Sequence, residues 1–211
     1  MIPLPLKLAY SAFVAVLVPI YLATYGPMNF LYFCDVALLL ALVAVWAESP
    51  LLAGIPAVGI VLPQLFWVVD FAAGFFGASP IGLAEYMFRE TIPLGARLLS
   101  LFHGWLPFLL LWLVWRLGYD RRSFLAWTAL AWGLMLASYF ALPGPPAPAD
   151  DPNQPVNVNY VYGLSESGPQ QWLPPLAYLG AMMVLLPLAA WWPTHLFFAR
   201  FAPGSALRGA R

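Results

Sequence analysis

The sequence predicts an all-α integral membrane protein, a single domain built as a six-transmembrane-helix bundle. Hydrophobic residues make up 63% of the 211 residues and charged residues 9%, which is too little charge for the surface of a water-soluble domain. The mean hydropathy is +0.80. The apolar runs are continuous rather than alternating, which favours helices over the strands of a membrane barrel. A span needs about 20 residues, so the chain has room for six and little else.

Turn signals between the apolar runs place the spans. Lys7 precedes an apolar stretch without a small-residue cleavage site, so we expect a retained first span rather than a signal peptide. Gly26-Pro27, Glu48-Ser49-Pro50 and Gly118-Tyr119-Asp120 mark the ends of the first, second and fourth spans. The expected spans are 6–25, 29–47, 51–77, 94–116, 122–142 and 173–199. Several contain a proline, which membrane helices tolerate where neighbours satisfy the freed carbonyls.

Two connecting segments are not simple turns. Residues 79–91 (SPIGLAEYMFRET) mix aromatic with charged side chains, as a short helix in the membrane interface would. Residues 143–172 form a polar outer loop, whose first half has the composition of a disordered linker. Its second half contains Asn157, Asn159 and Tyr160, and either folds back over the bundle as a lid or forms a solvated loop with aromatic residues at headgroup level.

Basic residues predict the orientation of the bundle. Six spans put both termini on one side, which carries most of the basic side chains. These are Lys7, Arg116, Arg121, Arg122, Arg200, Arg208 and Arg211, against Arg89 and Arg97 on the other side. The positive-inside rule then predicts a multi-pass protein of the cell membrane with both termini cytoplasmic.

Composition also limits the partners. The net charge is zero and no basic stripe is present, which argues against nucleic acid. The single cysteine excludes an internal disulfide and a cysteine-based metal cluster. Membrane lipid is the expected partner and no cofactor is expected. The sequence carries no signal of oligomeric state.

Three ionisable side chains inside apolar runs are the first site candidates. They are Asp35 in NFLYFCDVALLL, Asp70 in QLFWVVDFAAG and His103 in LLSLFHGWLPF. A charge near the centre of a bilayer costs about 3 kcal/mol on insertion scales, so such residues usually face the interior of a bundle and carry function. Counted along their helices, all three fall in the outer half of the membrane, where three consecutive helices can share one pocket.

Cys34 adds a nucleophile to this group. A thiol attacks as thiolate, and His103 is the imidazole at a similar depth that could take its proton. Asp70 or Asp35 could hold the other ring nitrogen, and Asn29, Tyr32 or Asn159 could stabilise an oxyanion.

Ser100 is a rival nucleophile one turn before His103, and a serine in a membrane helix more commonly bonds its own backbone. Gln64 and Trp67 are expected to line the pocket.

A metal site would use Asp35, Asp70 and His103 as three ligands with an open fourth position. The chain has two histidines and no HExxH spacing, so no metal is expected. Glu48 and His195, near the cytoplasmic ends of their spans, are expected to be interfacial.

The segments NFLYFCDVALLL and SLFHGWLPFLLLWL resemble YwaF-type bacterial membrane proteins. Their distant animal relatives include a transmembrane lipid acyltransferase and the androgen-induced intramembrane hydrolases of fatty acid esters of hydroxy fatty acids. The resemblance implies a six-helix bundle with a nucleophile and a histidine within the membrane. Cys34 matches the nucleophile and His103 the histidine, whereas Asp70 and the outer NVNYVYG segment have no counterpart.

The expected function is therefore that of an intramembrane lipid hydrolase or acyltransferase acting on an acyl ester. One alternative is a lipid-binding or proton- or cation-coupled bundle in which Asp35, Asp70 and His103 do no covalent chemistry. The lack of an inverted repeat argues against a transporter. Another alternative is a non-catalytic scaffold.

Overall fold

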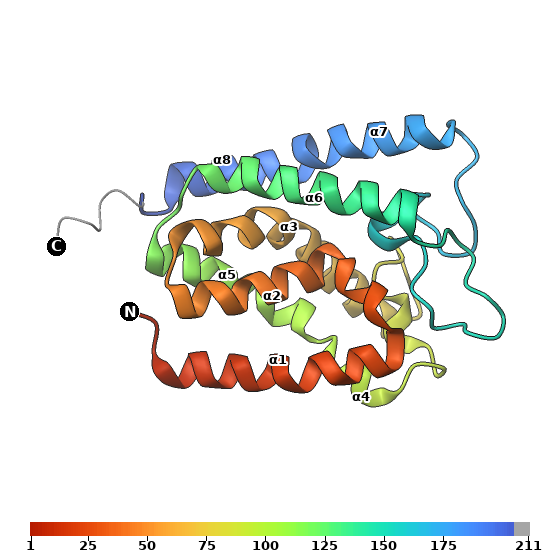
Figure 1. The fold of residues 1–211 in the computed structure, drawn as a ribbon, viewed down its shortest axis with the longest axis horizontal. Coiled ribbons are helices and arrows are strands. Elements are labelled where there is room, and N and C mark those ends of the chain that lie inside the picture. The colour runs from red at the N-terminus through yellow and green to blue at the C-terminus, as the bar shows by residue number, and fades with distance from the viewer. Residues whose placement is uncertain (205–211) are drawn as a thin grey trace.

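The protein is an all-α bundle with the composition of a membrane protein, as the computed structural model of residues 1–204 describes it (Figure 1). Five helical segments are long and apolar enough to cross a membrane, and a shorter apolar helix lies among them. The helices are α1 (Leu4–Tyr25), α2 (Phe33–Ala47), α3 (Pro50–Gly74), α4 (Leu94–Leu99), α5 (Phe102–Leu117), α6 (Arg122–Ala141), α7 (Pro175–Leu186) and α8 (Trp192–Phe201).

The expected spans agree with these helices within a few residues, with three local differences. The second span begins with a separate 3₁₀ turn, Pro27–Leu31, before α2. The fourth span is divided into α4 and α5 at Ser100 and Leu101. The segment 79–91 contains one short 3₁₀ turn, Glu85–Phe88, in place of an interfacial helix.

The sixth span is continuous through a π-helical turn, Pro187–Trp191, between α7 and α8. Pro187 has no N–H, so the carbonyl of Met183 loses the donor that an α-helix would provide. The indole Nε1 of Trp132 on α6 donates to that carbonyl at 2.8 Å. A neighbouring helix thus satisfies the freed carbonyl, as expected for a proline inside a membrane helix.

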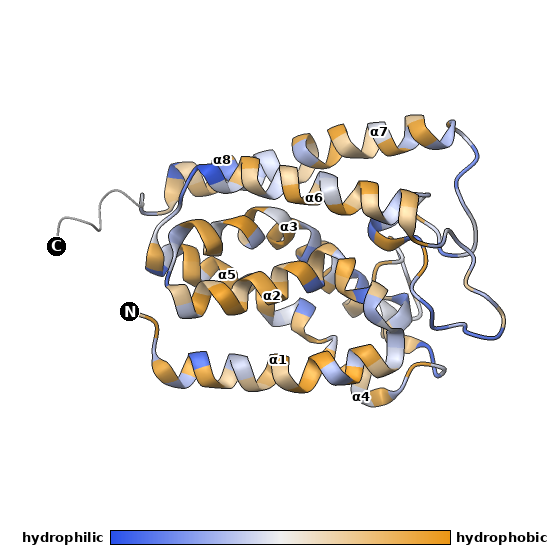
Figure 2. Ribbon diagram, in the orientation of Figure 1, coloured by the Kyte–Doolittle hydropathy of each residue, from blue (hydrophilic) through white to orange (hydrophobic). Residues whose placement is uncertain are grey.

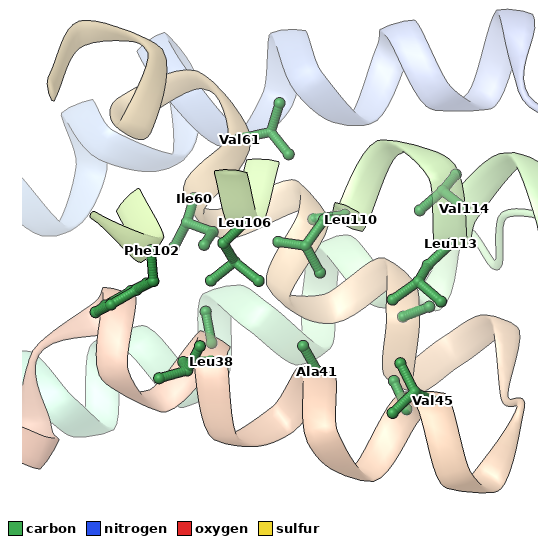
Figure 3. Close-up of a cluster of buried hydrophobic side chains, with 14 of the residues drawn as sticks. Leu38, Ala41, Val45, Ile60, Val61, Phe102, Leu106, Leu110, Leu113 and Val114 are labelled. Carbon is green, nitrogen blue, oxygen red and sulfur yellow. The ribbon is translucent and has the colours of Figure 1, made fainter. Parts of the chain in front are cut away.

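Helix α3 lies at the centre and contacts α2, α5 and α6. Its most apolar stretch is 56% buried, against 22% for that of α1. Side chains of α2, α3 and α5 interdigitate in the core that Figure 3 shows, among them Leu38, Ile60 and Leu106. The α3–α6 contact needs Gly59, because a Cβ there would overlap the ring of Trp127. In lipid the hydrophobic effect does not bring helices together, so small residues that permit close packing help them to associate.

The two ends of the bundle differ. Helix α1 begins and α8 ends at one end, and the long segments 75–93 and 142–174 cover the other, which carries much of the hydrophilic chain (Figures 1 and 2). Arg116 donates to the carbonyl of Met1, and the N–H of Tyr119 donates to the carbonyl of Pro203, so both ends of the described chain meet the α5–α6 turn. At this terminal end Lys7 lies 2.7 Å from Glu48 and holds the pKa of that carboxyl below its usual range.

Candidate functional site

A cavity of about 830 Å³ lies at the loop-covered end of the bundle. Its walls come from α1, the beginning of α2, the middle of α3, the beginning of α5, the π-helical turn and both long segments. Its volume falls within the range of ligand sites, roughly 300 to 1,000 Å³. Every candidate residue from the sequence except Asp70 lines it: Asn29, Tyr32, Cys34, Asp35, Gln64, Trp67, Ser100, His103, Asn159 and Tyr160.

Asp70 lies outside this cavity, so the expectation that it orients His103 is wrong. One of its carboxylate oxygens, Oδ1, accepts the backbone N–H groups of Ile81 and Gly82 at 2.9 and 3.3 Å, and Oδ2 accepts that of Ala84 at 2.9 Å. It lines a smaller pocket beside Gly77 and Phe88. The carboxylate fixes the loop that follows α3, because these N–H groups have no place in a regular helix.

Replacing Asp70 is therefore expected to lower the stability of the protein and to leave the catalytic rate unchanged. Asp70→Ala leaves three N–H groups without their acceptor and is expected to cost about 2 kcal/mol, while Asp70→Asn keeps one carbonyl oxygen and costs about half as much. Thermal unfolding in a mild detergent measures both. If Asp70→Asn lost catalytic turnover while its stability stayed unchanged, Asp70 would again be assigned to orienting the His103 imidazole.

The tautomer of His103 follows from its hydrogen bond. The Nδ1 atom lies 2.7 Å from the carbonyl oxygen of Ser100, and a carbonyl can only accept, so Nδ1 carries the hydrogen. In the neutral ring Nε2 is then the acceptor. The imidazole stacks on Trp67 with ring centroids 4.9 Å apart and on Phe102 at 4.1 Å. These contacts hold the ring in place with a lone pair free to take a proton.

Cys34 and Asp35 form a pair within the cavity wall. The thiol donates to Oδ2 of Asp35 at 3.7 Å, and the side-chain amide of Asn29 donates to the same oxygen at 3.2 Å. Among the described residues no hydrogen bond joins the sulfur to His103, and Oδ1 of Asp35 has no partner. Cys34 and His103 thus share the cavity, while the thiol is directed to Asp35.

Ser100 is held from two sides. Its hydroxyl donates to the carbonyl of Ala96 at 3.1 Å, so the Tyr21 hydroxyl, 2.5 Å away, must donate to it. This is the backbone bonding common for serine in membrane helices. The serine oxygen has given its proton away from His103, which leaves Ser100 as a positioning residue for Tyr21 and, through its carbonyl, for the imidazole.

The segment around Asn159 packs against the bundle, so the expectation of a lid is confirmed and that of a solvated loop is wrong. Asn159 Oδ1 accepts the N–H of Phe33, and its Nδ2 donates to the Leu31 carbonyl and to Ser138 Oγ. Tyr32 donates to the Val156 carbonyl. Asn157, Asn159 and Tyr160 have positive φ of 52°, 60° and 58°, which costs free energy and persists where surrounding bonds fix the backbone.

The expected oxyanion donors therefore already have partners. Asn29 donates to Asp35, Tyr32 to Val156, and Asn159 to Leu31 and Ser138. Other polar atoms on cavity residues are buried without a partner in the described chain: the Gln64 amide, Trp67 Nε1 and the Tyr25 hydroxyl. Buried polar groups are normally bonded, so these atoms indicate a ligand or ordered water.

The sequence did not point to three tyrosines and an ion pair at the site. Tyr21, Tyr25 and Tyr86 line the cavity, and burial raises the pKa of Tyr86 well above its usual value, so its phenol is neutral and can donate. Arg89 and Glu166, 2.9 Å apart, also line it and join the two long segments. The one-turn spacing of Tyr21 and Tyr25 was the available signal for a shared face.

The metal hypothesis loses one of its three ligands, because Asp70 lies outside the cavity. Among residues 1–204 no three histidine, cysteine or acidic side chains lie close enough to hold a metal ion together. No family model, curated protein or solved structure matches this chain. The resemblance to YwaF-type proteins therefore stays a prediction, and the function has to be argued from the cavity.

Proposed function

We propose that the protein is an intramembrane lipid hydrolase or acyltransferase in which Cys34 is the nucleophile and His103 the general base. The observation that carries the proposal is a cavity lined by both residues, with the proton-accepting nitrogen of His103 set by the Ser100 carbonyl. A nucleophile and a base with a fixed tautomer are the minimum for covalent acyl transfer.

The steps balance with the residues of the cavity. His103 Nε2 takes the thiol proton, the thiolate attacks the carbonyl carbon of an acyl ester, and the ester oxygen leaves with the proton from His103. The product is a thioester on Cys34. Water or a second lipid hydroxyl then gives its proton to His103 and attacks the thioester, and the imidazole returns the proton to the sulfur.

Asp35 has a place in this cycle before the attack. In the structure the thiol donates to Asp35 Oδ2, so this hydrogen bond must break before the thiol proton can pass to His103. We assign Asp35 to holding the thiol in its protonated, unreactive form until a ligand occupies the cavity. The resting enzyme is thereby protected from reaction with unspecific electrophiles.

Covalent labelling tests the proposal. The chain has one cysteine, so an alkyne-tagged long-chain thioester or activated ester that acylates the purified protein at a thiol must do so at Cys34. We expect acylation of the native protein and none of Cys34→Ala, with a loss of at least about a hundredfold in rate for His103→Ala. Labelling by a long-chain maleimide at high pH, where the thiol ionises without a general base, serves as the control for access to the thiol. Equal acylation of native protein and His103→Ala would contradict the mechanism.

A second candidate function is the non-covalent binding of a lipid in the same cavity. The unpartnered atoms of Gln64, Trp67 and Tyr25 favour it, since they offer donors and an acceptor without a nucleophile. Full ligand binding and full biological activity of Cys34→Ala would support this function over acyl transfer.

We propose the cell membrane as the location, with both termini cytoplasmic. The described basic residues near the terminal end are Lys7, Arg116, Arg121, Arg122 and Arg200, whereas Arg208 and Arg211 lie outside the described residues. A periplasmic reporter fused after Arg211 is expected to be inactive and a cytoplasmic one active. The reverse result would place the cavity in the inner half of the membrane.

A further inference from the structure

We propose that the cavity binds an amphiphile through an ammonium group, with Asp35 as its counter-ion and Tyr21, Tyr25 and Tyr86 as aromatic walls. The inference rests on the proposed function, because it names the headgroup chemistry of the lipid that the same cavity would take. It stands on a buried carboxylate oxygen without a partner, on the absence of an ion pair to Asp35 among the described residues, and on the tyrosines that line the same cavity.

The carboxylate of Asp35 is built into the wall and incompletely satisfied. The residue is 3% exposed, and Oδ2 receives two neutral donors, the Cys34 thiol and the Asn29 amide. Oδ1 has no donor among the described residues. A buried carboxylate costs several kcal/mol unless a positive charge and hydrogen bonds compensate it. Its free oxygen, in a residue that lines a ligand-sized cavity, is a site for a cation.

The chain supplies no such cation in the residues that the structure describes. Their ion pairs involve Glu48, Asp120 and Glu166 and none involves Asp35. Arg89, the basic residue that lines the cavity, is paired with Glu166. The Arg97 guanidinium donates to the Met87 carbonyl, outside the cavity lining. His103 gives its Nδ1 hydrogen to Ser100 and makes no ion pair with Asp35.

Three tyrosines line the same cavity as the free oxygen. Tyr21 and Tyr25, one turn apart on α1 with ring centroids 5.2 Å apart, are close enough to interact electrostatically with Asp35. Tyr86 also lines the cavity, and its ring contacts that of His103 with centroids 6.4 Å apart. An ammonium is attracted to the faces of such rings, and a carboxylate with aromatic walls is a known solution for alkylammonium groups. Trp67 already stacks on both His103 and Phe71, which favours the tyrosines as the walls for the ammonium.

The rest of the cavity fits the apolar part of such a ligand. Phe66 of α3, Leu186 at the end of α7, and Ala190 and Trp191 of the π-helical turn extend the lining into the apolar part of the bundle. π-Helical turns inside α-helices frequently occur at functional sites. A buried carboxylate and apolar side chains in one cavity suit an amine-bearing amphiphile better than a small hydrated cation.

The test measures binding of unreactive probes to the protein in nanodiscs of neutral lipid. Dodecyltrimethylammonium is expected to bind at least about tenfold more tightly than dodecanol, and more tightly than dodecanoate. Asp35→Asn, which keeps the size of the side chain, should remove this preference while leaving dodecanol binding unchanged. Tyr25→Leu should weaken ammonium binding several-fold and Tyr25→Phe should not, because the ring face is what matters. Glu48→Gln, a carboxylate change at the terminal end, is the matched control and should have no effect.

Tetramethylammonium and sodium chloride test whether the bound cation is a lipid headgroup, a free amine or a metal ion. Binding of tetramethylammonium alone, without the alkyl chain, would assign the site to a free amine rather than a lipid, and competition by sodium would assign it to a metal cation; either would overturn the amphiphile. Equal binding of dodecanol and dodecyltrimethylammonium, or an unchanged preference in Asp35→Asn, would overturn the counter-ion role. Since the probes carry no ester, failure of acyl labelling at Cys34 leaves this result intact, and the two hypotheses fail separately.

Discussion

His103→Ala is expected to lower the rate of acyl transfer by about 10²- to 10⁴-fold with little change in ligand binding, because it removes the general base and leaves the remaining walls of the cavity. His103→Gln sharpens the test, since glutamine can hydrogen-bond to the Ser100 carbonyl but cannot take a proton from the thiol. Turnover of a soluble-chromophore ester of a long-chain fatty acid measures the rate. Its dependence on substrate concentration separates loss of chemistry from loss of binding.

The second histidine provides the matched control. His195 lies in α8 near the terminal end and contacts the Tyr119 hydroxyl at 2.7 Å through Nδ1. It does not line the cavity, so His195→Ala should leave turnover within about twofold of the native rate. If His195→Ala reduced turnover as much as His103→Ala, the effect would be on folding, and the assignment of the base would have to be withdrawn.

The sequence predicted the spans, and it singled out residues that line one cavity, because both predictions depend on the cost of burying polar groups in hydrocarbon. Burying a polar side chain in hydrocarbon is costly, so apolar runs mark the helices and Asp35 and His103 within them mark the interior. The same argument placed Asp70 at the site, and there it was wrong. Asp70 does escape lipid, but by bonding the loop at Ile81, Gly82 and Ala84. Burial cost identifies residues that need partners and does not say which partners they take.

Partners depend on backbone details that periodicity does not encode. Gly77 and Gly82 have positive φ, which turns the loop back onto Asp70, and no pattern of apolar residues predicts that turn. Tyr21 and Tyr25 were not distinguished because tyrosine near the end of a span is typical of the membrane interface. Arg89 and Glu166 are 77 residues apart in loops of unlike composition, so their ion pair required the fold.

Asn159→Ala is expected to have the largest effect on stability, about 3 kcal/mol, because one side chain joins the outer segment to the bundle. It removes a hydrogen bond to each of Phe33, Leu31 and Ser138, and leaves the first N–H of α2 without its acceptor. Alanine at a φ of 60° is also strained by about 1 kcal/mol. Unfolding in a denaturing detergent series measures the loss of free energy.

A graded set of substitutions separates the causes of that loss. Asn159→Gly removes the same bonds but suits the positive φ, so it should be less destabilising than alanine. Asn159→Asp keeps an acceptor for the Phe33 N–H but loses both donors and sets a buried carboxylate against the Leu31 carbonyl, so it should cost at least as much as alanine. Asn153→Ala, in the same segment but with an exposed bond to the Thr91 carbonyl, should cost less than about 1 kcal/mol. Equal effects of Asn153→Ala and Asn159→Ala would mean that the bonds of Asn159 do not hold the segment over the cavity. Because this segment supplies part of the cavity wall, Asn159→Ala should also weaken ligand binding under conditions where the bundle itself remains folded.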